Sequence, residues 1–134
     1  MKNYLKKLDE NLVFIKSFTK GDTLKIYTEL TNVDNKLIHS RKVRVIKDIP
    51  YNNYKVELHI ISKKYFNEDP EIDKLTVSEK LSFVNSTGRR TLRLDNLILE
   101  LCAEMSAIGC ERIVRKNIAN ISDSSILRLI KKNE

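Results

Sequence analysis

The sequence predicts an α+β protein in which antiparallel β-hairpins are followed by three helices. Apolar and polar residues alternate with a period of two before Leu81, which is typical of half-buried strands, and with a helical period after it. The chain has 134 residues, 41% of them hydrophobic, which is enough for a real core. We divide it into a β-rich basic domain, residues 1–80, and a helical domain, residues 81–134.

Two hairpins are expected in the first domain. The first runs from Asn11 to Thr31, where the segments NLVFIKSF and TLKIYTEL flank a turn whose Gly21 supplies the positive φ that a tight hairpin turn requires. The second runs from about Lys36 to Phe66, with alternating basic and aliphatic residues before a Pro-Tyr-Asn-Asn turn. Before Asn53 we expect no helix beyond a short one around residues 4–8.

The first helix of the second domain is predicted within TLRLDNLILELCAEM. Apolar residues recur on one face at helical spacing, and polar residues recur on the opposite face, so the helix is amphipathic. The apolar face comprises Leu94, Leu97, Ile98, Leu101 and Met105, and the polar face comprises Arg93, Asn96, Glu100 and Glu104.

Two shorter helices follow. One is expected from Gly109 to Asn117 with Ile113 and Val114 facing inward. The last begins in NISDSSILRLIKK, where Ser122 can cap the free amides of the first turn. Asp123 suits the positive end of this helix, and Lys131 and Lys132 suit its negative end. Its apolar side is expected to consist of Ile126, Leu127 and Ile130.

Cysteine content and hydropathy indicate the cellular compartment of the protein. Cys102 and Cys110 lie in helical patterns without a Cys-x-x-Cys pair, which favours small core residues over a disulfide or a zinc site. The chain has no apolar run of membrane-spanning length, and its first ten residues lack the apolar centre of a signal peptide. The sequence therefore predicts a cytoplasmic protein without a membrane partner.

The charge favours a polyanionic partner. The formal net charge is +7, and much of the excess is concentrated on the second hairpin. Between residues 36 and 64 the acidic residues are Asp48 and Glu57, and the basic residues are Lys36, Arg41, Lys42, Arg44, Lys47, Lys55, Lys63 and Lys64. An ordinary solvated lysine-rich surface would show the same composition.

The three-helix pattern with a short, capped, basic last helix is that of a helix-turn-helix candidate for double-stranded DNA. Residues on the outward face of the last helix are candidates for contacts to base edges and phosphates. Basic residues near the first helix and on the second hairpin are candidates for contacts to phosphates. The candidate DNA-binding residues are Ser124, Ser125, Arg128, Lys131, Lys132, Arg89, Arg90, Arg93, Arg41 and Arg44. A helical bundle without a DNA role, and a solvated linker at residues 89–93, are the alternatives.

The order of these features resembles the N-terminal region of insertion-sequence transposases of the ISL-three type. The resemblance rests on the hairpin LVFIKSFTKGDTLKIYTEL, the basic strand HSRKVRVIKDIP, the strand VELHIISKKYF and the Arg-rich entry TGRRTLRLDNLILEL into the helices. It implies a degenerate zinc-ribbon-like arrangement of the hairpins, followed by a helix-turn-helix unit.

Two departures from that family stand out. Its cysteine pairs are replaced here by TNVDNKLI and by Asn67 and Ile72, so neither a metal nor another cofactor is expected. We expect the region to be held by apolar packing of Tyr65, Phe66, Ile72, Leu75 and Val77 instead. A loop cluster of carboxylates that could attract a divalent cation, but is better explained as solvated, comprises Glu68, Asp69, Glu71 and Asp73.

The second departure concerns catalysis. The family's acidic catalytic triad belongs to a later domain, and the sequence to residue 134 contains no substitute for it. We therefore expect a stand-alone DNA-binding protein, not an enzyme, that acts as a regulator or accessory factor. The alternative is a protein-interaction module or inhibitor that binds a related transposase or an acidic host protein. Homodimerisation is left open.

Overall fold

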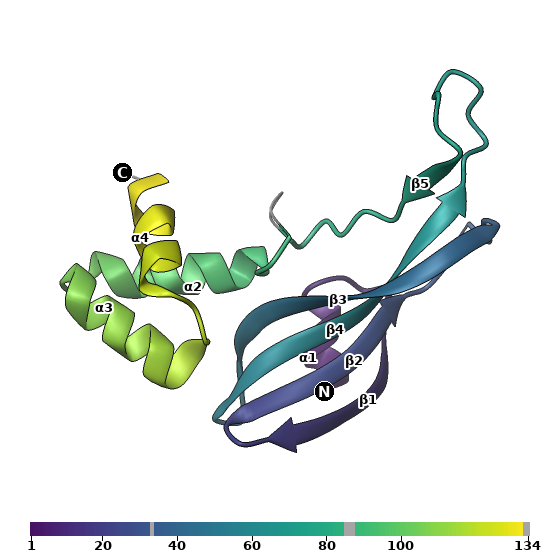
Figure 1. Cartoon of the computed structure of the whole chain (residues 1–134). Coiled ribbons are helices and arrows are strands. Elements are labelled where there is room, and N and C mark those ends of the chain that lie inside the picture. The colour runs from purple at the N-terminus through teal and green to yellow at the C-terminus, as the bar shows by residue number, and fades with distance from the viewer. Residues whose placement is uncertain (33, 85–87, 133–134) are drawn as a thin grey trace.

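The computed structural model describes residues 1–32, 34–84 and 88–132 and confirms the α+β class (Figure 1). A short helix, α1 (Lys2–Lys6), precedes a sheet of five strands, and helices follow the sheet. The strands are β1 (Leu12–Lys20), β2 (Thr23–Leu30), β3 (Ile38–Tyr51), β4 (Tyr54–Phe66) and β5 (Thr76–Ser78). The helices after the sheet are α2 (Leu92–Ala103), α3 (Ala107–Ile113), the π-helix η1 (Val114–Ile118) and α4 (Asp123–Lys132).

Both predicted hairpins form, and their turns explain why. In the β1–β2 turn Gly21 has a φ of +62°, the left-handed conformation expected for it. In the β3–β4 turn Asn52 and Asn53 have φ values of 48° and 66°, and Tyr51 pairs with Tyr54. Positive φ at both central residues defines a type I′ turn, for which asparagine is well suited. Local turn chemistry therefore fixes each hairpin.

The two hairpins join through a parallel pair of strands, which the prediction of two antiparallel hairpins did not include. The strand order is β1-β2-β4-β3, and β2 pairs with β4 in parallel from Thr23↔Lys55 to Glu29↔Ile61. Farther along β4, beyond its contact with β2, Lys64 to Phe66 pair with β5. The sheet is therefore mixed.

The two faces of the sheet have different surroundings. Side chains from β2, β3 and β4 alternate, and the even-numbered ones form a buried inner face against Tyr4 and Leu5 of α1. Figure 1 shows α1 behind the sheet, with the other face turned to the viewer. The inner core includes Leu24, Ile26, Ile46, Val56, Leu58, Ile60, Leu81 and Phe83.

The helices pack around a second core. Leu94 and Ile98 of α2 are buried in it as predicted, whereas Leu97, Leu101 and Met105 are half-buried. Its buried members are Leu94, Ile98, Cys110, Val114, Ala119, Ile121, Ile126 and Leu129. The two cores meet at Ile49, which packs against both.

Two predicted core positions in the later helices are wrong. Ile113 is exposed while Val114 is buried, and Leu127 is exposed while Leu129 takes its place in the core. In α4 the buried pair Ile126 and Leu129 is spaced by three residues, which also satisfies a helical face. The spacing alone did not distinguish these two faces.

The loop after β4 is not held by apolar packing, contrary to the prediction. Phe66, Ile72, Leu75 and Val77 are exposed, Leu75 by 74%. The Asn67 side-chain amide instead donates to the carbonyl oxygens of Asp69, Ile72 and Lys74 at 2.8–3.0 Å. Hydrogen bonds from one polar side chain thus hold the loop together.

The cysteines also correct a prediction, because Cys102 and Cys110 form a disulfide with a Cα–Cα distance of 5.2 Å. The bond joins the end of α2 to α3 across the connection between them. The two residues are eight apart, yet they lie on different helices, so the helical pattern concealed their proximity.

We expect reduction of this disulfide to lower the free energy of unfolding by about 2–3 kcal/mol, the loop-closure value for a short loop. Denaturant titrations with and without a thiol reductant measure it. A Cys102→Ala variant should be less stable than the oxidised protein and insensitive to reductant. Titration of two free thiols in the unreduced, denatured protein would contradict the assignment.

Candidate nucleic-acid interface

Helix α4 begins as the sequence predicted. The Ser122 hydroxyl accepts from the Ser125 amide at 3.2 Å, which caps the first turn. Asp123 lies in the first turn, and Lys131 and Lys132 lie in the last. Because Ile126 and Leu129 face the core, the opposite side of α4 is presented to solvent.

The predicted residues of α4 do not all share that surface equally. Ser124, Arg128 and Lys131 are exposed and recur at helical spacing, and Lys132 is exposed beside them. Ser125 is half-buried, and its hydroxyl lies 2.9 Å from that of Ser122. Ser125 therefore belongs to the cap. Ser124 and Arg128 are exposed to solvent, although the Ser124 hydroxyl also lies 3.3 Å from that of Ser122. The Arg128 Nε donates to the Ser124 carbonyl at 3.3 Å, which holds its stem along the helix.

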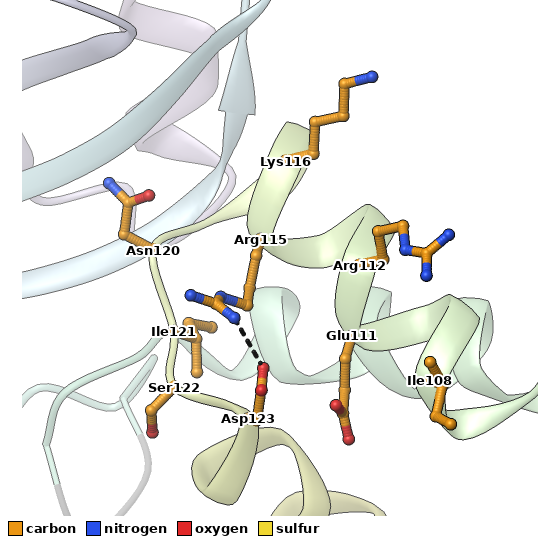
Figure 2. A pocket seen from close by; sticks show the side chains of 9 residues that line it. All are labelled: Ile108, Glu111, Arg112, Arg115, Lys116, Asn120, Ile121, Ser122 and Asp123. Atoms are coloured by element: carbon orange, nitrogen blue, oxygen red, sulfur yellow. Dashed lines mark hydrogen bonds and ion pairs between the residues drawn. The ribbon is translucent and has the colours of Figure 1, made fainter.

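The structure adds three basic residues that the sequence analysis did not identify. Arg112, Arg115 and Lys116 lie on the exposed side of α3 and η1, next to the beginning of α4. Their spacing of three and four residues places them on one helical face, which is a signal that the sequence does carry. With Glu111, Ser122 and Asp123 they line an open groove of about 690 Å³ (Figure 2).

Two acidic residues, Glu111 and Asp123, also line this groove, and Arg115 forms an ion pair with Asp123. Their Nη1–Oδ1 distance is 3.1 Å, and both side chains are more than half exposed. Exposed ion pairs of this kind contribute about 0–1 kcal/mol to stability, so an incoming phosphate can compete with Asp123 for Arg115. In Figure 2 Arg112 and Lys116 extend away from that pair.

Two groups of side-chain contacts join the helices to the sheet. The first is formed by Arg93. The fully buried Asp48 of β3 accepts from Arg93 Nε at 2.8 Å and Nη2 at 2.5 Å. It also accepts from the hydroxyl of Thr91 at 2.7 Å, and that same hydroxyl caps α2 by accepting from the Leu94 amide.

Arg93 is therefore enclosed by the fold. It donates to the Tyr4 carbonyl at 3.0 Å and lies over the Tyr4 ring, 4.2 Å from its centroid. Burial alone would lower the pKa of Arg93, but the hydrogen bonds and charge of Asp48 outweigh it, so the pKa is raised. Predicted as a phosphate contact, Arg93 is instead held in the joint between α2 and the sheet.

The second group is formed by two lysines of the sheet. Lys55 donates to the Arg115 carbonyl at 2.6 Å and to the Asn120 side chain at 2.8 Å, and Lys47 donates to the Asn120 carbonyl. Carbonyls at the end of a helix carry partial negative charge, which ammonium groups stabilise. Burial lowers the pKa of Lys47; the charge of Glu57 opposes this shift, and the charges of Arg90 and Arg89 add to it. The second hairpin, β3 with β4, thus positions the segment that enters α4.

The other predicted arginines lie away from the exposed face of α4, and Arg44, Arg89 and Arg90 lie near one another beside β3. Arg90 pairs with Asp95 at 2.6 Å, and Arg89 is exposed beside it. Arg44 donates to the Gly88 carbonyl at 3.4 Å, while Arg41 lies exposed near the beginning of β3. The structure gathers the α4 residues into one surface but does not gather these arginines with them.

Asn67 and Ile72, which the sequence analysis placed where the resembling transposases carry cysteines, offer no zinc ligands. The Asn67 amide is engaged within its own loop, and Ile72 offers no ligand atom. Among residues 1–32, 34–84 and 88–132, no three His, Cys, Asp or Glu side chains are grouped so as to hold a metal ion.

Comparison with protein-family models, curated proteins and solved structures yields no match to this chain. In the described part of the chain, no helix has the length and apolar character needed to cross a membrane.

Proposed function

We propose that the chain binds double-stranded DNA through a helix-turn-helix unit and acts as a non-catalytic regulator or accessory factor of the transposase type. In this proposal α3 with η1 is the first helix of the motif, residues 119–122 form the turn, and α4 is the recognition helix. The observation that carries it is the exposed α4 face of Ser124 and Arg128, beside the basic groove.

In this proposal, one set of residues contacts base edges and another contacts the phosphate backbone. A recognition helix enters the major groove with its N-terminal part, where Ser124 lies, and Arg128 follows one turn later on the same face of α4. Lys131 and Lys132 lie later on α4, and Arg112 and Lys116 lie across the groove, in positions suited to phosphates. Because Ser122 caps α4 and the helices contact the sheet at Arg93 and Asn120, these side chains would be presented on a rigid support.

We expect Arg128→Ala to reduce the discrimination between a selected duplex and a random duplex by about 1–3 kcal/mol, the value of one bidentate contact to a base. Lys132→Ala should weaken both duplexes alike and reduce the salt slope by about one unit, as expected for a lost phosphate contact. Selection from a random duplex pool supplies the specific sequence, and fluorescence anisotropy against salt concentration measures both effects. Equal binding by parent and both variants, or no duplex binding at low salt, would refute the proposal.

A protein-interaction role is the second candidate, and two exposed apolar side chains favour it. Ile108 lines the same groove and is 72% exposed, and Leu127 of α4 is exposed as well. An apolar helix of a partner protein would cover both. Salt dependence separates the two functions, because counterion release makes duplex binding fall steeply with salt while an apolar interface is far less sensitive.

A cytoplasmic location remains our expectation, and it has a consequence for the disulfide. Reducing cytosol keeps most protein thiols reduced, so the bond between Cys102 and Cys110 would form there under oxidising conditions. The DNA-binding experiments should therefore be run on both the oxidised and the reduced protein.

A further inference from the structure

The outer face of the sheet, opposite α1, carries more basic than acidic residues. We assign side chains to it from the strand pairing, since directly paired residues share a face. Within β1 to β4 its acidic members are Glu29 and Glu57, and its basic members are Lys16, Lys20, Lys25, Arg41, Lys47, Lys55 and Lys63. Lys47, Lys55 and Lys63 are engaged inside the protein, whereas Lys16, Lys20 and Arg41 are exposed.

A row of three aromatic rings crosses the same face. Phe18 of β1 stacks with Tyr27 of β2 at 5.9 Å between centroids, and Tyr27 stacks with His59 of β4 at 4.7 Å. The interplanar angles are 26° and 22°, so the rings are nearly parallel. Lys16 Nζ lies 4.8 Å from the centroid of Tyr27, which adds a cation to the row.

The row ends in solvent. Phe18 stands on β1, the edge strand of the sheet, and is 45% exposed. A planar group can therefore continue the stack on Phe18. Val43 and Val45 of β3 are also about half exposed and extend the apolar surface beyond His59.

We propose that the outer face of the sheet binds single-stranded nucleic acid. Stacked aromatic rings hold unpaired bases on open sheets, and flanking lysines neutralise the phosphates between them. A duplex has its bases stacked on one another and unavailable to Phe18, which is why the aromatic row favours a single strand. The site uses none of the α4 residues and does not depend on their role.

The test uses a fluorescein-labelled single-stranded oligothymidylate of about 12 nucleotides, within the length that one such surface covers. Phe18→Ala should weaken its binding about tenfold, as expected for the loss of one stacked base. Lys25→Glu should weaken it as well, and should do so more at low salt than at high salt. The matched control is Phe14→Ala, since Phe14 lies on the same strand with a similar exposure of 38% and pairs with the inner-face residue Thr28.

The outcomes are separable from those for duplex DNA. Weakening by Phe18→Ala but not by Phe14→Ala, with Arg128→Ala leaving the single strand unaffected, supports the proposal. Equal effects of the two phenylalanine variants, or no binding of the oligothymidylate by the parent at low salt, overturns it. A parent that dimerises through this face instead would fail to bind the probe, and sedimentation of Phe18→Ala against the parent would identify that case.

Discussion

Replacing Asp48 with alanine is expected to lower the free energy of unfolding by about 3–5 kcal/mol, the cost of leaving one partner of a buried ion pair uncompensated. The variant strands the Arg93 guanidinium between α1 and α2 and removes the acceptor of the Thr91 hydroxyl. Because these contacts join the sheet to α2, both parts should lose stability together. Urea denaturation followed by circular dichroism measures the change.

The exposed pair of Arg115 and Asp123 provides the control for this experiment. Asp123→Ala removes a carboxylate from an arginine at 3.1 Å, but in solvent, so its cost should stay below about 1 kcal/mol. A similar loss of stability in both variants would show that Asp48 has no special role in joining the sheet to the helices.

Replacing Lys63 with methionine should lower the free energy of unfolding by about 3 kcal/mol. The substitution removes the cation beside a buried carboxylate but preserves the length of the side chain. Lys63 is 4% exposed, donates to the Leu30 carbonyl and lies 3.5 Å from Glu79, which is 8% exposed. Burial, together with the Glu79 carboxylate, raises the pKa of Tyr65 to about 12, so Tyr65 still donates its hydrogen bond to Glu79 in the variant. Thermal and urea denaturation report the loss.

Two further variants check the cause. Lys64→Met removes an exposed lysine from the next position of β4 and should change stability by less than about 0.5 kcal/mol. Adding Glu79→Leu to Lys63→Met removes the stranded carboxylate and should restore much of the loss, because apolar replacement of a whole buried pair is often neutral. A double variant no more stable than Lys63→Met would contradict the ion-pair explanation.

What the sequence could predict of the fold depends on how far apart the interacting residues are. Hairpins rest on neighbouring strands and on the turn at Gly21 or at Asn52 and Asn53, and these were predictable. The parallel register of β2 on β4 depends on packing across the inner face. The alternating residue pattern of each strand would be the same beside a different neighbouring strand, so it does not predict this pairing. The disulfide likewise depends on how two helices cross.

The candidate site divides in the same way. The cap at Ser122 and the outward position of Arg128 follow from helical spacing within one short segment. The position of Arg93 does not, because a surface arginine and one paired with a buried Asp48 look alike in sequence. The partners of Lys55 at Arg115 and Asn120 lie 60 and 65 residues away, beyond the reach of any local pattern.

The parallel pairing of β2 with β4 has a consequence for the order in which the chain folds. Each hairpin closes through a short turn, and hairpins form in about 1–10 μs. The parallel pair forms once the second hairpin is complete, so this step carries the larger loop-closure entropy and is expected to limit the folding rate. Until it forms, β2 presents an unpaired edge with Leu24 and Ile26 uncovered. A nascent chain synthesised only through β3 is therefore expected to be prone to aggregation through this edge.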